Sequence, residues 1–281
     1  MRCGVGGWSY RVAMPEGDSV HRLAARLRQV DGSRVVNGEL RGGPDAGRAF
    51  GDRVVTGHAT HGKHLLTRFD DGMTLHTHMR MQGSWTVTAA GRRLPRHVVQ
   101  DARVRLVLED GRTVWGIDLP VVELVPTAEE HRVVGHLGPD LLHDDFDRDE
   151  ALRRCSRDPD APIRRVLLDQ RRVAGLGNLW ANELCFVRGL HPDLPAGRVA
   201  FGPLLDTARR MLRHSATAPD AYQVTTGVLR RGERHWVVGR AGRPCLRCGT
   251  RVRARDDVEV VGSPARRLWW CPRCQPEPKA A

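Results

Sequence analysis

Four cysteines near the C-terminus constrain the fold more than any other feature of the sequence. They form two Cys-x-x-Cys pairs, Cys245 with Cys248 and Cys271 with Cys274, and residues 249–270 separate the pairs. Thiolates at these spacings can form a tetrahedral Zn²⁺ site in which each pair supplies one edge. Because four cysteine ligands leave no open coordination position, we expect one structural zinc ion. The β-prone residues between the pairs predict a two-stranded zinc-finger hairpin.

The rest of the composition fits an intracellular chain. Three further cysteines, Cys3, Cys155 and Cys185, are scattered singly among the 281 residues, which argues for free thiols over a disulfide framework. The sequence contains no run of about 18 apolar residues that could span a membrane. Residues 1–13 lack the apolar stretch of a secretory signal. We therefore expect a cytoplasmic protein without a membrane partner.

The chain is strongly basic, with a net charge of +12 and a pI near 10.5. An arginine-rich proteome would account for this excess, and so would a polyanionic partner, because clustered arginines release counterions from nucleic acid. Charge alone leaves both explanations open. Several arginines do lie near the zinc-finger cysteines and two tryptophans, where they could grip phosphate: Arg251, Arg253, Arg255, Arg266 and Arg267.

The apolar pattern divides the chain into a β-rich half and a helical half. Apolar residues at helical spacing predict a helix over 19–30, with Asp18 or Ser19 as its N-cap. Short β-prone runs follow to about residue 125, including alternating apolar positions over 104–108 before an Asp110-Gly111 turn. We expect seven or eight strands in a β-sandwich. Helical patterns then recur at 147–156, 162–170, 178–187 and 203–214.

The predicted fold class is thus α+β and multi-domain. The N-terminal β-sandwich with its leading helix covers 14–126, a helical domain covers 127–235, and the four-cysteine zinc-finger hairpin covers 236–275. Residues 1–13 form an N-terminal extension and 276–281 a tail. Between two helices of the middle domain, Gly175-Leu176-Gly177 predicts a tight turn before Asn178. Such turns are common structural features, but free amides at a helix start also bind phosphate.

Four motifs together resemble the Fpg/Nei family of DNA glycosylases, which comprises formamidopyrimidine-DNA glycosylase and endonuclease VIII. "LLDQ…VAGLGN…ANEL" is similar to the family's helix–two-turns–helix, and "VVGRAGRPCLRCG…CPRCQ" to its zinc finger. "MPEG" resembles its N-terminus, and "GKHLLTRFDDGMTLHTHMRMQGSW" its central hairpins. The resemblance runs in the right order from Met14 to about Gln275. It implies an enzyme that excises damaged bases and then nicks the strand.

The resemblance also implies roles for particular residues. Pro15 would be the nucleophile, attacking C1′ of the flipped nucleotide through an N-terminal amine, with Glu16 as the adjacent general acid/base. Lys63 would contact phosphate and assist β-elimination, and Arg266 would hold phosphate and assist δ-elimination. The remaining positions imply DNA contacts: Arg80 and Met81 in the void-filling loop, His136, and the phosphate-binding Asn178.

Two departures from the family pattern bear on function. Relatives often read P-E-x-P-E at the N-terminus, whereas Asp18 and Ser19 stand at the last two of those places here. This departure puts a second catalytic carboxylate in doubt, and the chain resembles an actinobacterial endonuclease VIII-like branch. The gap between the cysteine pairs is also long, which could shift Arg266 on the hairpin.

The position of Pro15 raises the question of the mature N-terminus. Inside a chain its nitrogen is an amide and not nucleophilic, whereas a terminal α-amine is partly unprotonated at neutral pH. Residues 1–13 show no pattern of helix, strand or targeting signal. We therefore expect Met14 to be the initiator, with its removal exposing Pro15.

The leading hypothesis is a monomeric, nucleoid-associated DNA glycosylase and abasic-site lyase acting on double-stranded DNA with damaged bases or abasic sites. Oxidised pyrimidines are favoured over oxidised purines, because residues 215–235 show no obvious lesion-capping loop. The alternative is a non-catalytic damaged-DNA-binding protein of the same fold, which would lack a free proline amine. A zinc-ribbon adaptor explains the cysteines but leaves Pro15 and Lys63 unexplained.

Overall fold

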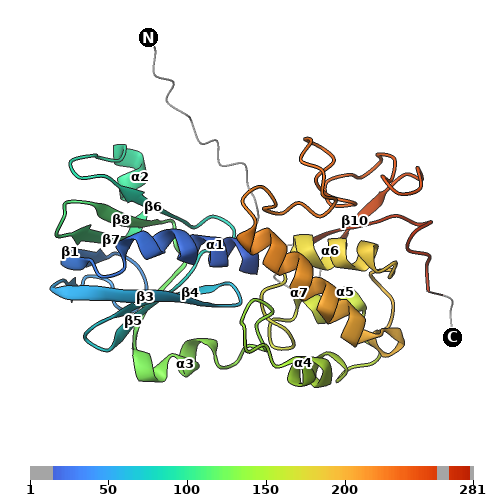
Figure 1. Cartoon of the computed structure of the whole chain (residues 1–281), viewed down its shortest axis with the longest axis horizontal. Helices are drawn as coiled ribbons and strands as arrows, with labels where there is room; N and C mark the ends of the chain where they lie inside the picture. Colours follow the sequence, from blue (N-terminus) through green and yellow to red (C-terminus); the bar gives the residue numbers. More distant parts are fainter. Residues whose placement is uncertain (1–14, 258–265, 279–281) are drawn as a thin grey trace, which may run out of the picture.

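Two large hydrophobic cores, and a small third cluster around the C-terminal cysteines, organise the chain in the computed structural model, which describes residues 15–257 and 266–278. One core lies between the strands and the first helix of the N-terminal half, and the other lies among the helices that follow. Figure 1 shows the strands of the N-terminal half at the left, helices α4 to α7 toward the right, and helices α1 and α7 meeting between the two halves. No helix in these described ranges is long and apolar enough to cross a membrane.

Helix α1 (Gly17–Leu27) continues into a 3₁₀ turn, Arg28–Val30. The apolar positions that predicted it are all buried: Val20, Leu23, Ala24, Leu27 and Val30. The predicted N-cap was wrong, because the cap is Glu16 and not Asp18 or Ser19. The helix begins early because the Glu16 carbonyl already accepts hydrogen bonds from the amides of Ser19 and Val20.

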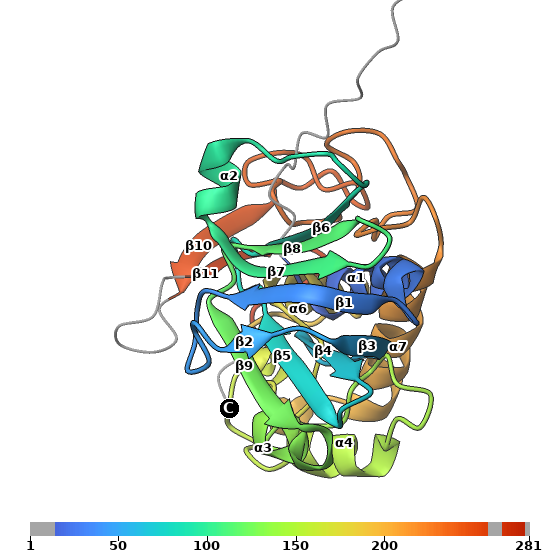
Figure 2. The same cartoon turned by 90° about the vertical axis from the view of Figure 1, so that its left-hand side faces the viewer.

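Nine strands form the N-terminal half, one more than the upper end of our expectation. They are β1 (Arg34–Leu40), β2 (Ala49–Phe50), β3 (Arg53–His61), β4 (His64–Phe69), β5 (Met73–His78), β6 (Ser84–Thr88), β7 (Ala102–Leu108), β8 (Thr113–Ile117) and β9 (Val121–Pro126). Their order is β6-β8-β7-β1-β3-β4-β5-β9, with β2 paired to β1. Only two residue pairs join β1 to β3, so the sheet splits there into the two layers of a β-sandwich (Figure 2).

The sequence pattern located the β7–β8 hairpin correctly. Val104, Leu106 and Leu108 are buried on one face, and Gly111 adopts the positive φ of 82° that such a turn needs. The short helix α2 (Arg96–Gln100), between β6 and β7, was not predicted. It buries none of its residues, so it has no apolar periodicity to detect.

The second half is helical, as the sequence predicted. After a 3₁₀ turn (Thr127–Glu129), its helices are α3 (His131–Val134), α4 (Arg148–Cys155), α5 (Ile163–Leu168), α6 (Asn178–Val187) and α7 (Phe201–Thr217). A further 3₁₀ turn, Ala196–Arg198, precedes α7. The core side chains include Trp180, Leu184 and Leu204, each fully buried. The four predicted helices therefore correspond to α4, α5, α6 and α7.

The C-terminal hairpin consists of antiparallel strands β10 (Arg253–Asp257) and β11 (Arg266–Trp270), as the cysteine spacing predicted. A buried carboxylate on α6 anchors the segment that leads into it. Glu183 accepts hydrogen bonds from the amides of Trp236, Val237 and Val238 at 2.8–2.9 Å, and from the Thr225 hydroxyl. One buried side chain thus ties the helices to the base of the zinc finger.

We predict that Glu183→Gln lowers the free energy of unfolding by about 3 kcal/mol, because an amide group would face donors that now meet a carboxylate oxygen. Chemical denaturation followed by circular dichroism measures this change. Glu129→Gln is the matched control, because Glu129 forms an exposed pair with Arg132, and it should change stability by less than about 0.5 kcal/mol. Equal effects of the two substitutions would contradict the anchoring role.

Candidate active site

Glu16 occupies the junction of the two halves. Its carboxylate is buried and accepts hydrogen bonds from the amides of Gly177 and Leu179, both at 2.8 Å, and from Trp180 at 3.4 Å. These amides form the N-terminus of α6, where a negative charge is stabilised by the helix dipole. Burial raises the pKa of Glu16 to about 7, although the nearby Lys63 charge and the amides favour the ionised form. Glu16 is therefore poised to exchange a proton near neutral pH.

This arrangement decides between the two interpretations of the glycine turn that the sequence left open. The amides of Gly177, Leu179 and Trp180, at the start of α6, point at Glu16 and so have a structural role. Asn178 does begin the helix, and its side chain is half-buried. Any phosphate contact at this turn would therefore involve Asn178 rather than the amides that Glu16 occupies.

Close backbone packing holds α1 against the glycine turn. The Gly17 amide donates to the Gly175 carbonyl at 2.8 Å, and a Cβ on Gly17 would lie 2.8 Å from the Gly175 Cα. Gly175 itself has a φ of +104°, which strongly favours glycine. Pro15, half-buried, directly precedes Glu16, so this packing fixes where Pro15 lies. Met14 and residues 1–13, with Cys3, are outside the described residues.

Lys63 lies in the turn between β3 and β4, which is attached to the helical half. The Gly62 amide donates to the buried carboxylate of Asp140 at 2.7 Å, and the His143 ring contacts the Thr60 carbonyl at 2.6 Å. Burial lowers the pKa of Lys63, and the Glu16 carboxylate opposes that effect. The half-buried Lys63 and the buried Glu16 are therefore close enough to affect each other's pKa electrostatically.

Arg266 begins β11 and pairs across the hairpin with Asp257. Its side chain is exposed, and its charge is among the causes that lower the pKa of Lys63. The zinc-finger arginine therefore acts electrostatically on the same site as Glu16. The structure thus brings together Glu16, Lys63 and Arg266, which lie in three distant parts of the sequence.

The predicted DNA-contacting loop projects from the end of β5. Met81 is 55% exposed, an unusual position for a large apolar side chain, and Arg80 has a positive φ of 47°. The Arg80 amide is held by the His78 ring at 2.9 Å. His136 is exposed, with its ring 6.4 Å from that of His64. Exposed apolar surface on a loop of unusual backbone conformation suits insertion into a base stack.

The four cysteines converge on one point. The Sγ atoms of Cys245 and Cys274 lie 4.0 Å apart, those of Cys248 and Cys271 lie 3.5 Å apart, and all four lie within 4.8 Å of one another. Zn–S bonds of about 2.3 Å in a tetrahedron place sulfurs about 3.8 Å apart, so the donor set fits zinc. By contrast, burial raises the pKa of Cys155 and Cys185 to about 12, as expected for inert thiols.

Asp18 is a feature whose role the sequence did not reveal. Its carboxylate is buried and accepts hydrogen bonds from the Ser215 hydroxyl at 2.5 Å and from the Ser19 amide at 2.9 Å. Burial raises its pKa, and its charge in turn raises the pKa of Glu16. A second carboxylate therefore does lie beside the site, at Asp18. Its partner on α7 is 197 residues away, and no local pattern signals such a contact.

The β-sandwich is joined through a helix–turn–helix junction to a four-cysteine hairpin, and a carboxylate, a lysine and an arginine converge on this junction. This is the architecture of a class of DNA-repair enzymes. Residues 14–119 match the formamidopyrimidine-DNA glycosylase N-terminal domain, and residues 137–215 match the formamidopyrimidine-DNA glycosylase H2TH domain. The chain belongs to this family, and it is a DNA glycosylase and abasic-site lyase of base-excision repair.

Curated relatives extend the similarity over nearly the whole chain. A probable endonuclease 8 2 of Streptomyces coelicolor is 44% identical over 271 residues, covering 94% of this chain and 95% of the relative. The DNA-(apurinic or apyrimidinic site) lyase Nei2 of Mycolicibacterium smegmatis is 38% identical, covering 93% and 99%. The fold also matches that of Lactococcus lactis formamidopyrimidine-DNA glycosylase bound to DNA with an abasic site (TM-score 0.73, 20% identity, 93% and 100% covered).

We predict that Gly17→Ala disturbs the junction itself. The added Cβ would clash with the Gly175 backbone, which should lower the free energy of unfolding by about 1–3 kcal/mol. The displacement should also slow strand cleavage, because Glu16 and Pro15 move with the start of α1. Gly42→Ala is the control, since its Cβ would meet only the flexible Arg103 side chain. Denaturation and single-turnover nicking assays measure both effects, and wild-type behaviour of Gly17→Ala would contradict the prediction.

Proposed function

We propose that this enzyme removes oxidised bases, preferentially pyrimidines, through a Schiff base formed by the amine of Pro15. The observation that carries the proposal is the carboxylate of Glu16, fixed on α6 one residue from Pro15 and electrostatically coupled to Lys63. The proposal requires a mature chain that begins at Pro15. The family match begins at residue 14, which supports Met14 as the initiator.

The proposed reaction has two stages. The Pro15 nitrogen bonds to C1′ as the bond from C1′ to the damaged base breaks, and the proton that the nitrogen loses neutralises the departing base. A proton from Glu16 to the ring oxygen then breaks the bond between that oxygen and C1′, which opens the sugar and leaves an iminium. Loss of the C2′ proton then expels the 3′ phosphate by β-elimination. Lys63 would contact phosphate and assist this step, and Arg266 would assist δ-elimination.

The proposed substrate is double-stranded DNA carrying a damaged base or an abasic site, bound by a monomer at the nucleoid. Residues 14–126 would form the catalytic domain and 127–235 the DNA-binding domain, with 236–275 as a zinc finger. Arg80 and Met81 would fill the space left by the flipped base, while Asn178 would bind phosphate and His136 would contact the DNA. Cys245, Cys248, Cys271 and Cys274 would hold one structural Zn²⁺, which keeps the hairpin folded.

Borohydride trapping on abasic-site DNA tests the nucleophile. We expect a stable protein–DNA adduct from protein that begins at Pro15 and none from protein that retains residues 1–13, because an amide nitrogen cannot form an iminium. Electrophoresis detects the adduct, and peptide mass spectrometry places it on Pro15. If the Pro15 form binds DNA and contains zinc but gives no adduct, the Schiff-base proposal fails, which leaves a monofunctional glycosylase or a DNA binder.

The pH dependence of base excision tests Glu16. A proton-donating Glu16 with a pKa of about 7 loses its proton as the pH rises through 7, whereas an α-amine near 8 becomes nucleophilic as the pH rises. Single-turnover rates should therefore form a bell with its maximum near pH 7.5, falling about tenfold per unit well outside it. Glu16→Gln should abolish the fall in rate on the alkaline side of the bell, and it should also remove most of the rate at every pH. A wild-type rate that keeps rising from pH 7 to 9 would exclude this role.

A further inference from the structure

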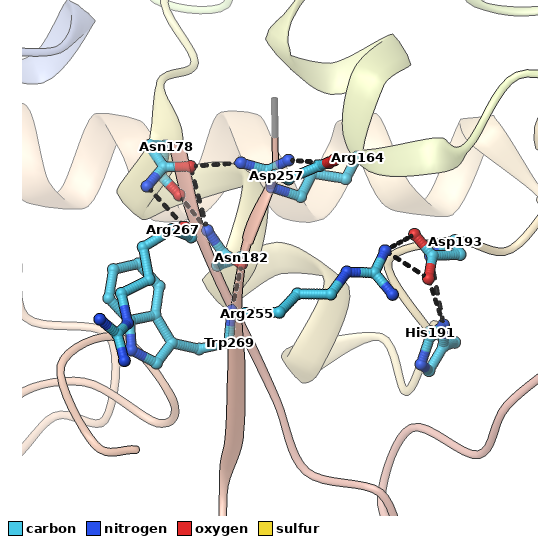
Figure 3. Close-up of polar contacts among 9 residues, drawn as sticks. All are labelled: Arg164, Asn178, Asn182, His191, Asp193, Arg255, Asp257, Arg267 and Trp269. Carbon is cyan, nitrogen blue, oxygen red and sulfur yellow. Dashed lines mark hydrogen bonds and ion pairs between the residues drawn. The ribbon is translucent and has the colours of Figure 1, made fainter. Parts of the chain in front are cut away.

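A buried arginine lies where α5, α6 and the zinc-finger hairpin meet. Arg164, on α5, is only 1% exposed. Its Nη2 donates to the Asn178 Oδ1 at 2.8 Å, and its Nη1 donates to the Asp257 Oδ2 at 3.0 Å (Figure 3). A buried cation is costly unless its partners are well placed. One guanidinium thus joins the start of α6 to the end of β10.

The first contact fixes the orientation of the Asn178 amide. A guanidinium has donors and no acceptor, so only the amide oxygen of Asn178 can face Arg164. The amide nitrogen then points to the hairpin, where it donates to the Arg267 carbonyl at 3.0 Å. Asn182 adds to this connection, because its Oδ1 accepts from the Trp269 amide at 3.0 Å. Asn178 is thereby held between α5 and β11.

The second contact fixes the strand that carries Arg266. Asp257 lies directly opposite Arg266 in the β10–β11 register. The ion pair of Arg164 with Asp257 therefore holds this end of the hairpin against α5. A further pair supports the middle of β10, where Arg255 donates to both oxygens of Asp193 at 2.6 and 2.7 Å (Figure 3).

We propose that Arg164 is a positioning residue that sets the distance between the two phosphate-binding side chains, Asn178 and Arg266. The inference rests on the proposed function, because it takes these two residues as the contacts to the DNA backbone. Arg164 itself is too buried to touch DNA. It acts by holding both groups at once, which a planar fork of N–H donors does and a lysine ammonium, as a point charge, does less well.

Three substitutions separate the two contacts. Arg164→Met removes both, Asp257→Asn weakens only the contact to the hairpin, and Arg164→Lys keeps the charge without the fork. Arg165→Met is the matched control, because it removes an equal charge from the exposed neighbouring position on α5. Fluorescence anisotropy measures Kd for a duplex with a tetrahydrofuran abasic-site analogue over a range of salt concentrations. Zinc content and thermal unfolding establish that each variant is folded.

We expect Arg164→Met to bind about 10- to 100-fold more weakly and its plot of log Kd against log salt to be shallower by about 1 to 2, since each lost phosphate contact removes about 0.9 from the slope. For Arg164→Lys and for Asp257→Asn the slope of log Kd against log salt should be shallower by about 1. Both variants should also lose δ-elimination product. Arg165→Met should keep the wild-type slope. Adding Asn178→Ala to Arg164→Met should weaken binding little further, because the two act as a unit.

A folded, zinc-containing Arg164→Met protein with the wild-type Kd and salt slope would overturn the proposal. A merely structural role would lower the unfolding temperature without changing the slope. If Arg164→Met does not fold, Asp257→Asn and Arg164→Lys test the proposal instead. A wild-type salt slope and a wild-type ratio of δ- to β-elimination products in both variants would overturn the proposal. Binding to the tetrahydrofuran duplex needs no chemistry. Absence of a borohydride adduct would therefore refute the Schiff base and leave this test unaffected.

Discussion

The hydrogen bonds between the Glu16 carboxylate and the N-terminus of α6 are the interaction on which the site depends. They join residues 161 and 163 positions apart in the sequence, and they place a negative charge where the helix dipole favours it. The carboxylate thereby closes the junction between the β-sandwich and the helices. Because Pro15 is adjacent, the same contacts position the proposed nucleophile.

Buried carboxylates serve the same purpose elsewhere in the chain. Asp140 holds the turn that bears Lys63, Asp18 holds α1 against α7, and Glu183 holds the segment before the zinc finger. Each accepts hydrogen bonds from a distant part of the sequence. A carboxylate suits this task because its two oxygens can accept several donors at once, and charge-assisted bonds are stronger than neutral ones. Separate elements thus become a single rigid support for the site.

The sequence was informative wherever the signal is local or periodic. The cysteine pairs predicted the hairpin, the apolar spacing predicted α1 and four later helices, and the motif order predicted the family. It was uninformative about which distant group a side chain meets. The N-cap of α1 was mispredicted and the occupation of the α6 amides was not foreseen for this reason, since Glu16 binds a helix that local spacing cannot associate with it. Arg164 gave no signal because an arginine in a helical pattern normally faces solvent.

Exposed and buried arginines have different effects on DNA binding: the exposed ones affect how tightly DNA is held, and the buried one affects where other groups lie. Exposed arginines keep their hydration and can exchange counterions for DNA phosphates, so the net charge of +12 bears on how tightly DNA is held. Arg164 is desolvated and already paired with Asp257, so it has no counterion to release. Its charge serves instead to fix the positions of Asn178 and Asp257, and through them the groups that we propose to meet phosphate. The number of exposed cations thus governs the strength and salt dependence of binding, whereas a buried one governs where the strand lies relative to Glu16 and Lys63.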